Sequence, residues 1–474
     1  MREHGVFIAG QWQEGAGAIT VHSPFDGREV ARVGRAGADQ LRAAVDAAAG
    51  AQEAMGALSP HERAAILERA AAEIAGRREE LAQLLVEEAG KPLALSRIEA
   101  ERCCETFGEA ARVARSPHAE LLDLEGFPSG TGRLGLLRRF PVGVVVGITP
   151  FNFPVNLVAH KLAPAVAAGC PIVLKPASQT PSAALLLAEI LNRAGVPPGG
   201  VNVVPCAGAE AGGLLEDPRV KLLSFTGSAQ VGWGLKQRMW DRKVSLELGG
   251  NAAVIVEPDA GDLEAVAKRI AAGAYSYAGQ SCISVQRVLV HEEIAARFAE
   301  ALAAATRTFP TGDPASEAVM CGPMITPGDA DRIEGWVSEA RASGSRSLAE
   351  GRRDGSLVFP TLLDRVPEGA RVWGDEAFAP IAVLGTYRAF DEALERVNDS
   401  RYGLQAGIFT RDVEKIQKAF ATLEVGGIIQ GDVPSWRADA MPYGGVKQSG
   451  VGREGPRWAV EEMTEPRLLV LRSG

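Results

Sequence analysis

One cysteine has a position and neighbours that suit chemistry. Cys282 follows a Gly-Gln-Ser turn in the stretch YAGQSCISVQRVLV (277–290). Apolar residues at helical spacing run from Leu263 to Tyr277 and end at Gly279, and a β-branched segment begins at Ile283. The thiol is therefore expected where a helix ends and a strand begins, a kind of position that often presents side chains to ligands. It is either a nucleophile or, as for most free cysteines, a buried packing residue.

Two other side chains suit the chemistry of a thiol nucleophile. Asn152 lies in a Pro-Phe-Asn-Phe-Pro corner, and an amide held this rigidly can stabilise an oxyanion. Its alternative use is a turn asparagine that bonds its own backbone. Glu247 lies in the apolar segment KVSLELGG, where burial would raise its pKa and suit a general base. A structural ion pair is the alternative for this carboxylate.

The sequence also contains a candidate phosphate site. In LLSFTGSAQVGWGL, a strand is followed by the turn Thr226-Gly227-Ser228 and by a helix that contains Gly232. A glycine turn at a helix N-terminus can bind a phosphate through backbone N–H groups, although a plain strand–helix turn has the same pattern. No Gly-x-Gly-x-x-Gly occurs in a strand–turn–helix context. Lys175 ends an apolar strand, where α/β sheets bind ligands, but an isolated lysine is more often solvated.

The elements that must position these residues alternate along the chain. Residues 37–115 are expected to be mostly helical, with Pro60 near a helix start. From 130 to 250 strands and helices take turns, which predicts a parallel sheet covered on both faces. A second alternating run covers about 252–430, with helices at 263–278 and 291–306 and strands at 284–290 and 426–430. The final segment, TEPRLLVLRSG, reads as a strand, which we expect to pair with the 131–141 stretch of another subunit.

Composition excludes several classes of protein. The chain has 474 residues and a net charge of −9, which argues against nucleic-acid binding. No apolar run is long enough for a bilayer, and the first residues lack the apolar segment of a secretory signal, so no membrane contact is expected. The six cysteines form no Cys-x-x-Cys pair and no disulfide framework, and the histidines form no His-Glu-x-x-His motif. We expect a cytoplasmic protein without a metal.

Taken together, the motifs carry a resemblance to one family. PFNFP, KPASQTP, FTGSAQVG, SLELGGN, GQSC, DEAFAP and MPYGGVKQSGVGREG occur in this order along the chain. The whole chain resembles the aldehyde dehydrogenase superfamily, in its NAD(P)-dependent, hydrolytic and non-acylating branch. The resemblance implies an α/β fold with a Rossmann-like cofactor domain (1–122 and 142–247), a second α/β catalytic domain (248–455) and a small β oligomerisation arm (123–141 and 456–474).

The resemblance also implies a mechanism. Cys282 would attack the aldehyde carbonyl, while the Asn152 amide and the Cys282 backbone N–H hold the oxyanion. Hydride transfer would leave a thioester, and water activated by Glu247 would hydrolyse it to the acid. Lys161 matches a lysine of the family's proton relay, with a surface role as the alternative. The glutamate that some members carry three residues after Glu454 is Arg457 here, which leaves Glu247 as the base.

The cofactor contacts are implied in the same way. Lys175 would reach the adenosine ribose, Gly227 to Gly232 would frame the pyrophosphate, Glu376 would hold the nicotinamide ribose and Phe378 would flank its ring. The full set of expected contacts is Thr149, Pro150, Phe151, Lys175, Ser178, Thr226, Gly227, Ser228, Val231, Gly232, Leu248, Glu376 and Phe378. Strict NAD users often have a glutamate at the position of Ser178. Because a serine does not repel a 2′-phosphate, we expect NADP to be accepted, alongside NAD.

The aldehyde itself is left open by the sequence. Residues that resemble the family's substrate funnel are Ser281, Ile283, Trp436, Arg437 and Tyr443. Arg437 could bind a carboxylate or phosphate, although a surface salt bridge is the commoner use of one arginine. The substrate is a small aliphatic or aromatic aldehyde, a lactaldehyde or a semialdehyde. The alternatives to this function are a CoA-acylating dehydrogenase and a non-catalytic protein on the same fold. The resemblance further implies a homodimer or homotetramer.

Overall fold

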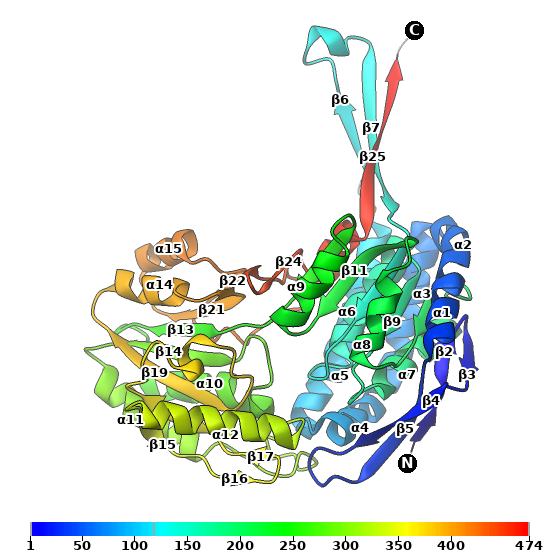
Figure 1. Cartoon of the computed structure of the whole chain (residues 1–474). Helices are drawn as coiled ribbons and strands as arrows, with labels where there is room; N and C mark the ends of the chain where they lie inside the picture. Colours follow the sequence, from blue (N-terminus) through cyan, green and yellow to red (C-terminus); the bar gives the residue numbers. More distant parts are fainter. Residues whose placement is uncertain (1, 117–118, 473–474) are drawn as a thin grey trace.

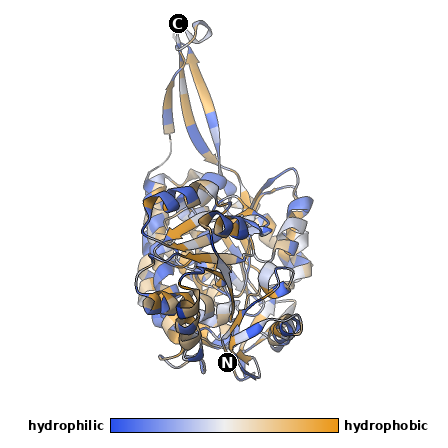
Figure 2. Ribbon diagram, turned by 90° about the vertical axis from the view of Figure 1, so that its left-hand side faces the viewer, coloured by the Kyte–Doolittle hydropathy of each residue, from blue (hydrophilic) through white to orange (hydrophobic). Residues whose placement is uncertain are grey.

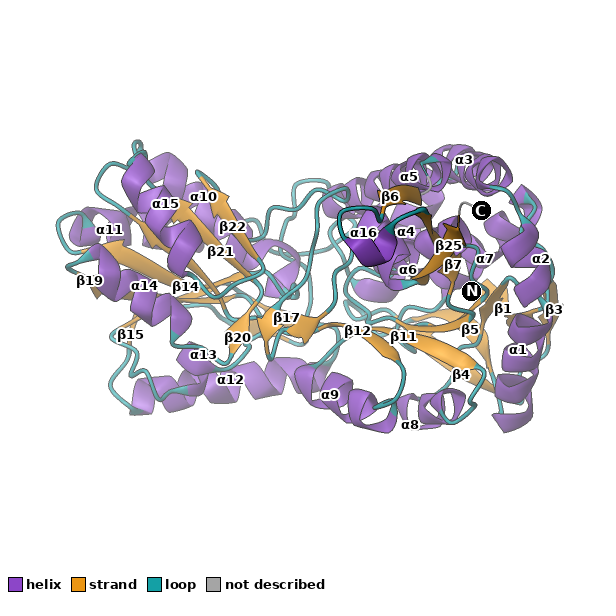
Figure 3. Cartoon of the chain, turned by 90° about the horizontal axis from the view of Figure 1, so that it is seen from above, coloured by secondary structure: helices purple, strands orange, loops and turns teal. Residues whose placement is uncertain are grey.

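Two large sheets and a projecting arm make up most of the fold (Figure 1). The computed structural model describes residues 2–116 and 119–472. Figure 3 shows the same arrangement from above, with the two sheets lying side by side in separate bodies. The alternation of strands and helices expected from the sequence is confirmed, and so is the α/β class of the fold.

The first sheet is parallel in its centre. Its strands follow the order β24 (Gly450–Val451), β12 (Lys243–Glu247), β11 (Val220–Thr226), β8 (Val144–Ile148), β9 (Ile172–Lys175), β10 (Val201–Val203), β2 (Val6–Ile8) and β3 (Gln11–Gln13). The five strands from β12 to β10 run parallel, whereas β24, β2 and β3 are antiparallel additions at the edges. The carboxyl ends of β8, β11 and β12 therefore meet at one edge of the sheet.

Helices cover both faces of this sheet, which explains why its strands are apolar throughout. One face packs against α3 (Pro60–Gly76), α5 (Leu93–Arg115), α6 (Asn156–Ala168) and α7 (Ser182–Ala194). The other face packs against α1 (Ala38–Gly50) and α9 (Ala229–Arg238). Pro60 is the first residue of α3, where its missing N–H costs no hydrogen bond, and Ser59 and Glu62 form a capping box.

The second sheet has the same two-sided design. Its order is β15 (Arg346–Ala349), β18 (Thr361–Asp364), β19 (Ile381–Tyr387), β14 (Val285–His291), β13 (Ala252–Val256), β21 (Gln405–Phe409) and β22 (Gly427–Gln430). Helices α10 (Leu263–Tyr275) and α11 (Ala295–Arg307) cover one face. Helices α14 (Phe390–Asn398) and α15 (Val413–Thr422) cover the other, and α12 (Pro327–Ala342) lies beside the sheet. Strand β14 starts close behind Cys282, as expected.

The arm is a three-stranded antiparallel sheet that extends away from the rest of the molecule (Figures 1 and 2). Its order is β25 (Thr464–Arg472), β7 (Arg133–Pro141) and β6 (Ala119–Asp123). The last strand pairs along its whole length with β7 of the same chain, so the expectation that it pairs with another subunit was wrong. Sequence spacing could not reveal this, because residues that bond across the two strands are far apart in the chain: Arg139 and Thr464 are 325 positions apart.

We propose the three-part division of the chain given above, with the pairings as its support. Three short segments cross the proposed boundaries. Strand β6 pairs with β7 of the arm although it begins before residue 123. Strand β24 returns from the second part to pair with β12, and α16 (Pro456–Glu462) packs mainly on α5 and α6. Among the described residues no helix has the length and apolar content that crossing a bilayer would need.

Candidate active site

One cavity of about 350 Å³ collects most of the side chains singled out in the sequence. The thiol of Cys282, the amide of Asn152 and the carboxyl group of Glu247 all line it. Asn152 and Cys282 are 130 positions apart in the chain. The other expected residues that line the cavity are Pro150, Phe151, Thr226, Gly227, Ser228, Leu248, Ser281, Ile283, Glu376, Phe378, Arg437 and Tyr443. Residues after β8, β11 and β12 form one wall, which is where parallel sheets bind ligands.

Strained backbone positions the thiol. After α10 ends, Tyr277 and Ala278 adopt left-handed φ values of 53° and 54°, which cost ~1–3 kcal/mol per residue. The next residues are held by the fully buried Gln280, whose amide donates to the carbonyls of Tyr277 and Pro323 and accepts from Ile325 N. The helix is thus forced to stop, and Cys282 is presented from a fixed loop.

The Asn152 corner lies directly against this loop. Asn152 Nδ2 donates a hydrogen bond to the carbonyl oxygen of Gln280, over 2.9 Å. The corner is fixed from behind by a buried ion pair of Lys91 and Glu99. Lys91 donates to the Asn152 carbonyl (3.2 Å), and Glu99 accepts from the N–H groups that follow Pro154. The prolines indicated a rigid corner in the sequence, but no sequence pattern indicated this ion pair.

Burial dominates the electrostatics of the reactive groups. Burial raises the pKa of the Cys282 thiol to about 12. Burial, and next the charge of Glu454, raise the pKa of Glu247 well above its ordinary value. Both carboxyl oxygens of Glu247 are buried without a hydrogen-bond partner among the described residues. A carboxyl group in this state keeps its proton to a higher pH than an ordinary glutamate and accepts a proton readily once ionised.

Lys161 lies behind Glu247 and is fully buried, so the alternative of a surface role was wrong. Its Nζ donates to the hydroxyls of Ser224 (3.1 Å) and Thr226 (2.8 Å) and lies 3.8 Å from Glu454 Oε1. Burial lowers the pKa of this lysine. Glu454, which was not predicted as a site residue, is buried and forms an ion pair with Arg437.

Arg437 is also buried, so the alternative of a surface salt bridge was wrong. Its Nη2 donates to Glu454 Oε2 over 2.9 Å, and its guanidinium carbon lies 3.8 Å from the centre of the Tyr443 ring. Its Nε is buried without a hydrogen-bond partner among the described residues. The Tyr443 hydroxyl in turn lies 2.9 Å from Cys282 Sγ.

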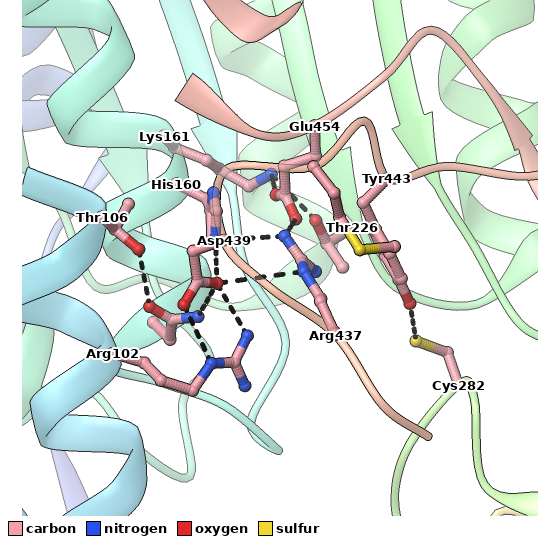
Figure 4. A network of polar contacts seen from close by, with 12 residues as sticks. Arg102, Thr106, His160, Lys161, Thr226, Cys282, Arg437, Asp439, Tyr443 and Glu454 are labelled. Carbon is pink, nitrogen blue, oxygen red and sulfur yellow. Dashed lines mark hydrogen bonds and ion pairs between the residues drawn. The ribbon is translucent and has the colours of Figure 1, made fainter. Parts of the chain in front are cut away.

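A polar network extends from Arg437 to a second arginine (Figure 4). His160 Nε2 lies 2.8 Å from Asp439 Oδ1, and Asp439 accepts two hydrogen bonds from the guanidinium of Arg102, over 2.7 and 2.9 Å. Arg102 lines the cavity from α5. The sequence suggested none of these three residues, although His160 is adjacent to Lys161.

The expected cofactor residues form a fitting cradle for a dinucleotide. Helix α9 starts after Ser228, whose side chain does not cap it, so its first N–H groups are free for a phosphate. A Cβ on Gly227 would lie 2.6 Å from the Phe225 ring, and one on Gly232 would lie 2.4 Å from Leu248, so both positions require glycine. The buried hydroxyl of Thr149 has no partner among the described residues.

Several expected cofactor residues do not line the cavity, among them Lys175, Ser178 and Val231. Lys175 ends β9 and is buried, which lowers the pKa of its ammonium group, and Ser178 is partly exposed three residues further on. Val231 lies half-exposed on the first turn of α9. Phe378 packs edge to face on Phe151 at 5.9 Å. Trp436 is 46% exposed and does not line the cavity, unlike the other expected funnel residues.

The fold and this cavity define a dinucleotide-binding α/β oxidoreductase built around one thiol. The family model described as "Aldehyde dehydrogenase family" matches residues 12–469. The chain belongs to the aldehyde dehydrogenase family, as its motifs suggested, and is an NAD(P)-dependent enzyme that oxidises an aldehyde to its acid.

Similar proteins share nearly the whole length. The chain is 43% identical to 3-sulfolactaldehyde dehydrogenase of Priestia aryabhattai over 473 residues, covering 99% of this chain and 98% of that protein. The crystal structure of aldehyde dehydrogenase 21 from Physcomitrella patens with the reaction product succinate superposes with a TM-score of 0.98 and 41% identity, covering 100% and 98%. NADP-dependent glyceraldehyde-3-phosphate dehydrogenase from Bacillus halodurans C-125, complexed with NADP, gives 0.97 and 31%, covering 100% of both chains.

Proposed function

We propose that this enzyme oxidises a short aldehyde with an anionic group, and that Cys282, Asn152 and Glu247 carry out the reaction. The supporting observation is that these three groups line one cavity together with the guanidinium of Arg102. A thiol beside a carboxyl group with a raised pKa suits acyl chemistry, and an arginine at the same cavity suits an anion.

In the proposed reaction the Cys282 thiolate attacks the carbonyl carbon, so that a C–S bond forms and the carbonyl π pair moves to oxygen. Asn152 Nδ2 and the Cys282 N–H stabilise this oxyanion. A nicotinamide held by the cradle described above would supply the acceptor for the hydride that leaves this carbon. Glu247 then takes a proton from water as the water oxygen bonds to the thioester carbon and the C–S bond breaks, releasing the acid. Lys161, beside Glu454, suits the onward relay of that proton.

The cradle described above supports the proposed cofactor contacts. The N-terminus of α9 would hold the pyrophosphate, Lys175 the adenosine ribose and Glu376 the nicotinamide ribose. Glu376 already accepts a hydrogen bond from Gly250 N over 3.0 Å, and burial raises its pKa to about 7. Ser178 supports the acceptance of NADP, because no carboxylate stands at this position to repel a 2′-phosphate.

Substitution of Ser178 by glutamate tests the cofactor proposal. We expect kcat/KM with NADP to fall at least about tenfold, because a carboxylate near a phosphate costs up to a few kcal/mol. The value with NAD should change less than about threefold. The exposed neighbour Gln179 gives a matched control, Gln179→Glu, which adds the same charge one residue away. Equal effects of both variants, or no NADP turnover in the unmodified enzyme, would refute the assignment.

Arg102 is the main support for an anionic substrate. Asp439 holds two of its nitrogens, and among the described residues no hydrogen bond involves its Nη1. Buried N–H groups of arginine bind carboxylate, sulfonate or phosphate oxygens well. Arg437 also lines this cavity and adds a second positive charge there. Two of the proteins compared above are named for 3-sulfolactaldehyde and glyceraldehyde-3-phosphate, and the third is in complex with its product succinate. Each of these three molecules carries an anionic group.

A pair of aldehydes of equal length tests this role. The unmodified enzyme should prefer succinic semialdehyde to butanal in kcat/KM. Substitution Arg102→Met should reduce that preference about tenfold or more, because a charge-assisted hydrogen bond contributes about 1.5–3 kcal/mol. The ratio of the two aldehydes within one variant cancels any general damage from the unpaired Asp439.

The control for this experiment is Arg97→Met, which removes an exposed arginine of the same helix that pairs with Glu79. Its preference for the charged aldehyde should equal that of the unmodified enzyme. An equal loss of activity on both aldehydes in the Arg102 variant would show that Arg102 does not select the anion.

The arm supports self-association, and we propose a homodimer or homotetramer. Hydrophobic residues run along its strands (Figure 2), and several of them are exposed, which is unusual for a surface in water. Exposed apolar residues of the arm are Leu121, Leu136, Leu468, Leu469, Val470 and Leu471. All six cysteines are free thiols, which supports a reducing compartment, and we propose the cytoplasm.

A further inference from the structure

The nucleophile proposed above has a hydrogen-bond partner that the proposed mechanism does not use. Tyr443 Oη lies 2.9 Å from Cys282 Sγ, and the Tyr443 side chain is buried in contact with the thiol (Figure 4). Two backbone hydrogen bonds between Tyr443 and Glu454, of 3.0 and 2.7 Å, fix the main chain of Tyr443, and the residue is only 3% exposed, so its ring is packed in place. The contact is therefore set by the fold rather than by a free rotamer.

A buried cation lies over the face of this tyrosine. The Arg437 guanidinium stands 3.8 Å from the ring centre, and its ion pair with Glu454 holds it there. A cation over an aromatic face is attracted by the π electrons and withdraws charge from the ring. The effect makes the phenolic O–H a better hydrogen-bond donor.

The thiol needs such a donor. Burial raises the pKa of Cys282, and the nearby carboxyl groups of Glu376 and Glu247 raise it further. The Tyr443 hydrogen bond and the Arg437 charge act in the opposite direction. Among the described residues, these four side chains shift the pKa of the Cys282 thiol. The thiolate is the form that attacks a carbonyl carbon.

We propose that Tyr443 is a catalytic residue whose hydroxyl donates a hydrogen bond to the Cys282 thiolate, with Arg437 positioned to strengthen that bond. The inference rests on Cys282 as the proposed nucleophile. The thiol proton leaves to solvent water before attack, and the hydroxyl proton stays on Tyr443 throughout. When the C–S bond forms, the negative charge moves from sulfur to the carbonyl oxygen beside Asn152.

Alkylation of Cys282 by iodoacetamide, followed by mass spectrometry as a function of pH, tests the proposal without aldehyde or cofactor. In Tyr443→Phe the midpoint of the rate profile should rise by about one pH unit, and the rate near neutral pH should fall about tenfold. Above both midpoints the two rates should converge, because a thiolate forms in either protein. A shift of this kind supports the proposed hydrogen bond.

Two further proteins sharpen the test. Tyr275→Phe removes another buried hydroxyl, which lies 3.2 Å from Thr306 Oγ1 in the second sheet's core, and should leave the profile unchanged. A 3-fluorotyrosine at position 443 keeps the shape of the ring but makes the hydroxyl more acidic, so the midpoint should move to lower pH. Opposite shifts from the two changes at one position are not expected from a packing defect.

Two outcomes would overturn the role of Tyr443. One is an unshifted profile in both position-443 proteins. The other is a rate lowered by the same factor at every pH, which indicates a structural role alone. A Cys282→Ala enzyme that keeps its dehydrogenase activity would instead overturn the proposed nucleophile, so the two failures are distinguishable.

Discussion

Cys282→Ala should lower the rate of NAD(P)H formation by at least about 10⁴-fold, because without the sulfur no covalent intermediate forms. The cavity has no substitute thiol, since the other five cysteines lie outside its lining. Alanine leaves the loop intact, because the strained turn is held by the backbone and the buried Gln280 rather than by the thiol. Cofactor binding, followed by fluorescence, should be unchanged.

The matched control for this variant is Cys104→Ala. Cys104 is also a free and partly exposed cysteine, and it lies on α5 outside the cavity. Activity of this control should stay within about twofold, as for a surface substitution. A Cys282→Ala enzyme with more than about a tenth of the original turnover would exclude the thiol as the nucleophile.

Glu247→Gln should lower steady-state turnover by roughly 10²–10³-fold, because it removes the general base of hydrolysis. The first turnover should survive, since attack and hydride transfer do not need this carboxylate. Rapid mixing should therefore show a burst of about one reduced nicotinamide per active site, followed by a slow phase. Space beside the Glu247 side chain is limited, because a Cβ on Gly444 would lie only 2.7 Å from Glu247 Oε1. Glutamine has the same size as glutamate and therefore fits the same space.

The pH dependence of the slow phase is a second readout. Burial raises the pKa of Glu247, so the neutral form predominates at low pH and the active base appears as the pH rises. Hydrolysis-limited turnover should therefore increase with pH in the unmodified enzyme, and this dependence should disappear in Glu247→Gln. Glu88→Gln is the matched control, because burial also raises the pKa of Glu88, to about 7, far from the cavity.

The same measurements separate hydrolysis from transfer to CoA. A hydrolytic enzyme releases the free acid, and its rate does not depend on CoA. A carboxyl group at position 247 favours hydrolysis, because only water needs a base there. If Glu247→Gln left turnover unchanged, or if CoA were required for it, the proposed role of Glu247 would be wrong.

Much of this protein follows from short stretches of its sequence. Apolar strands and amphipathic helices in alternation predict a covered parallel sheet, because local periodicity reports which faces are buried. Cys282, Asn152 and Glu247 stood out because each is a polar residue in an apolar or rigid setting. The glycines at 227 and 232 stood out because a turn into a helix needs close backbone approach. Each of these signals is contained within about a dozen neighbouring residues.

The tertiary structure alone decided what surrounds that chemistry. Arg102 and Asp439 are 337 residues apart. Arg102 lies in a charged helix whose other arginines face solvent, so no local sequence pattern indicates that Arg102 points toward the cavity. Arg437 gave the pattern of a surface residue, yet it is buried between Glu454 and Tyr443. Periodicity along the chain specifies which side of an element is covered but not which distant residue covers it, because that contact depends on packing between elements. The family could be predicted from the sequence, and so could the residues that we propose to react, whereas the place of Arg102 at the cavity and the partner of the thiol required the folded chain.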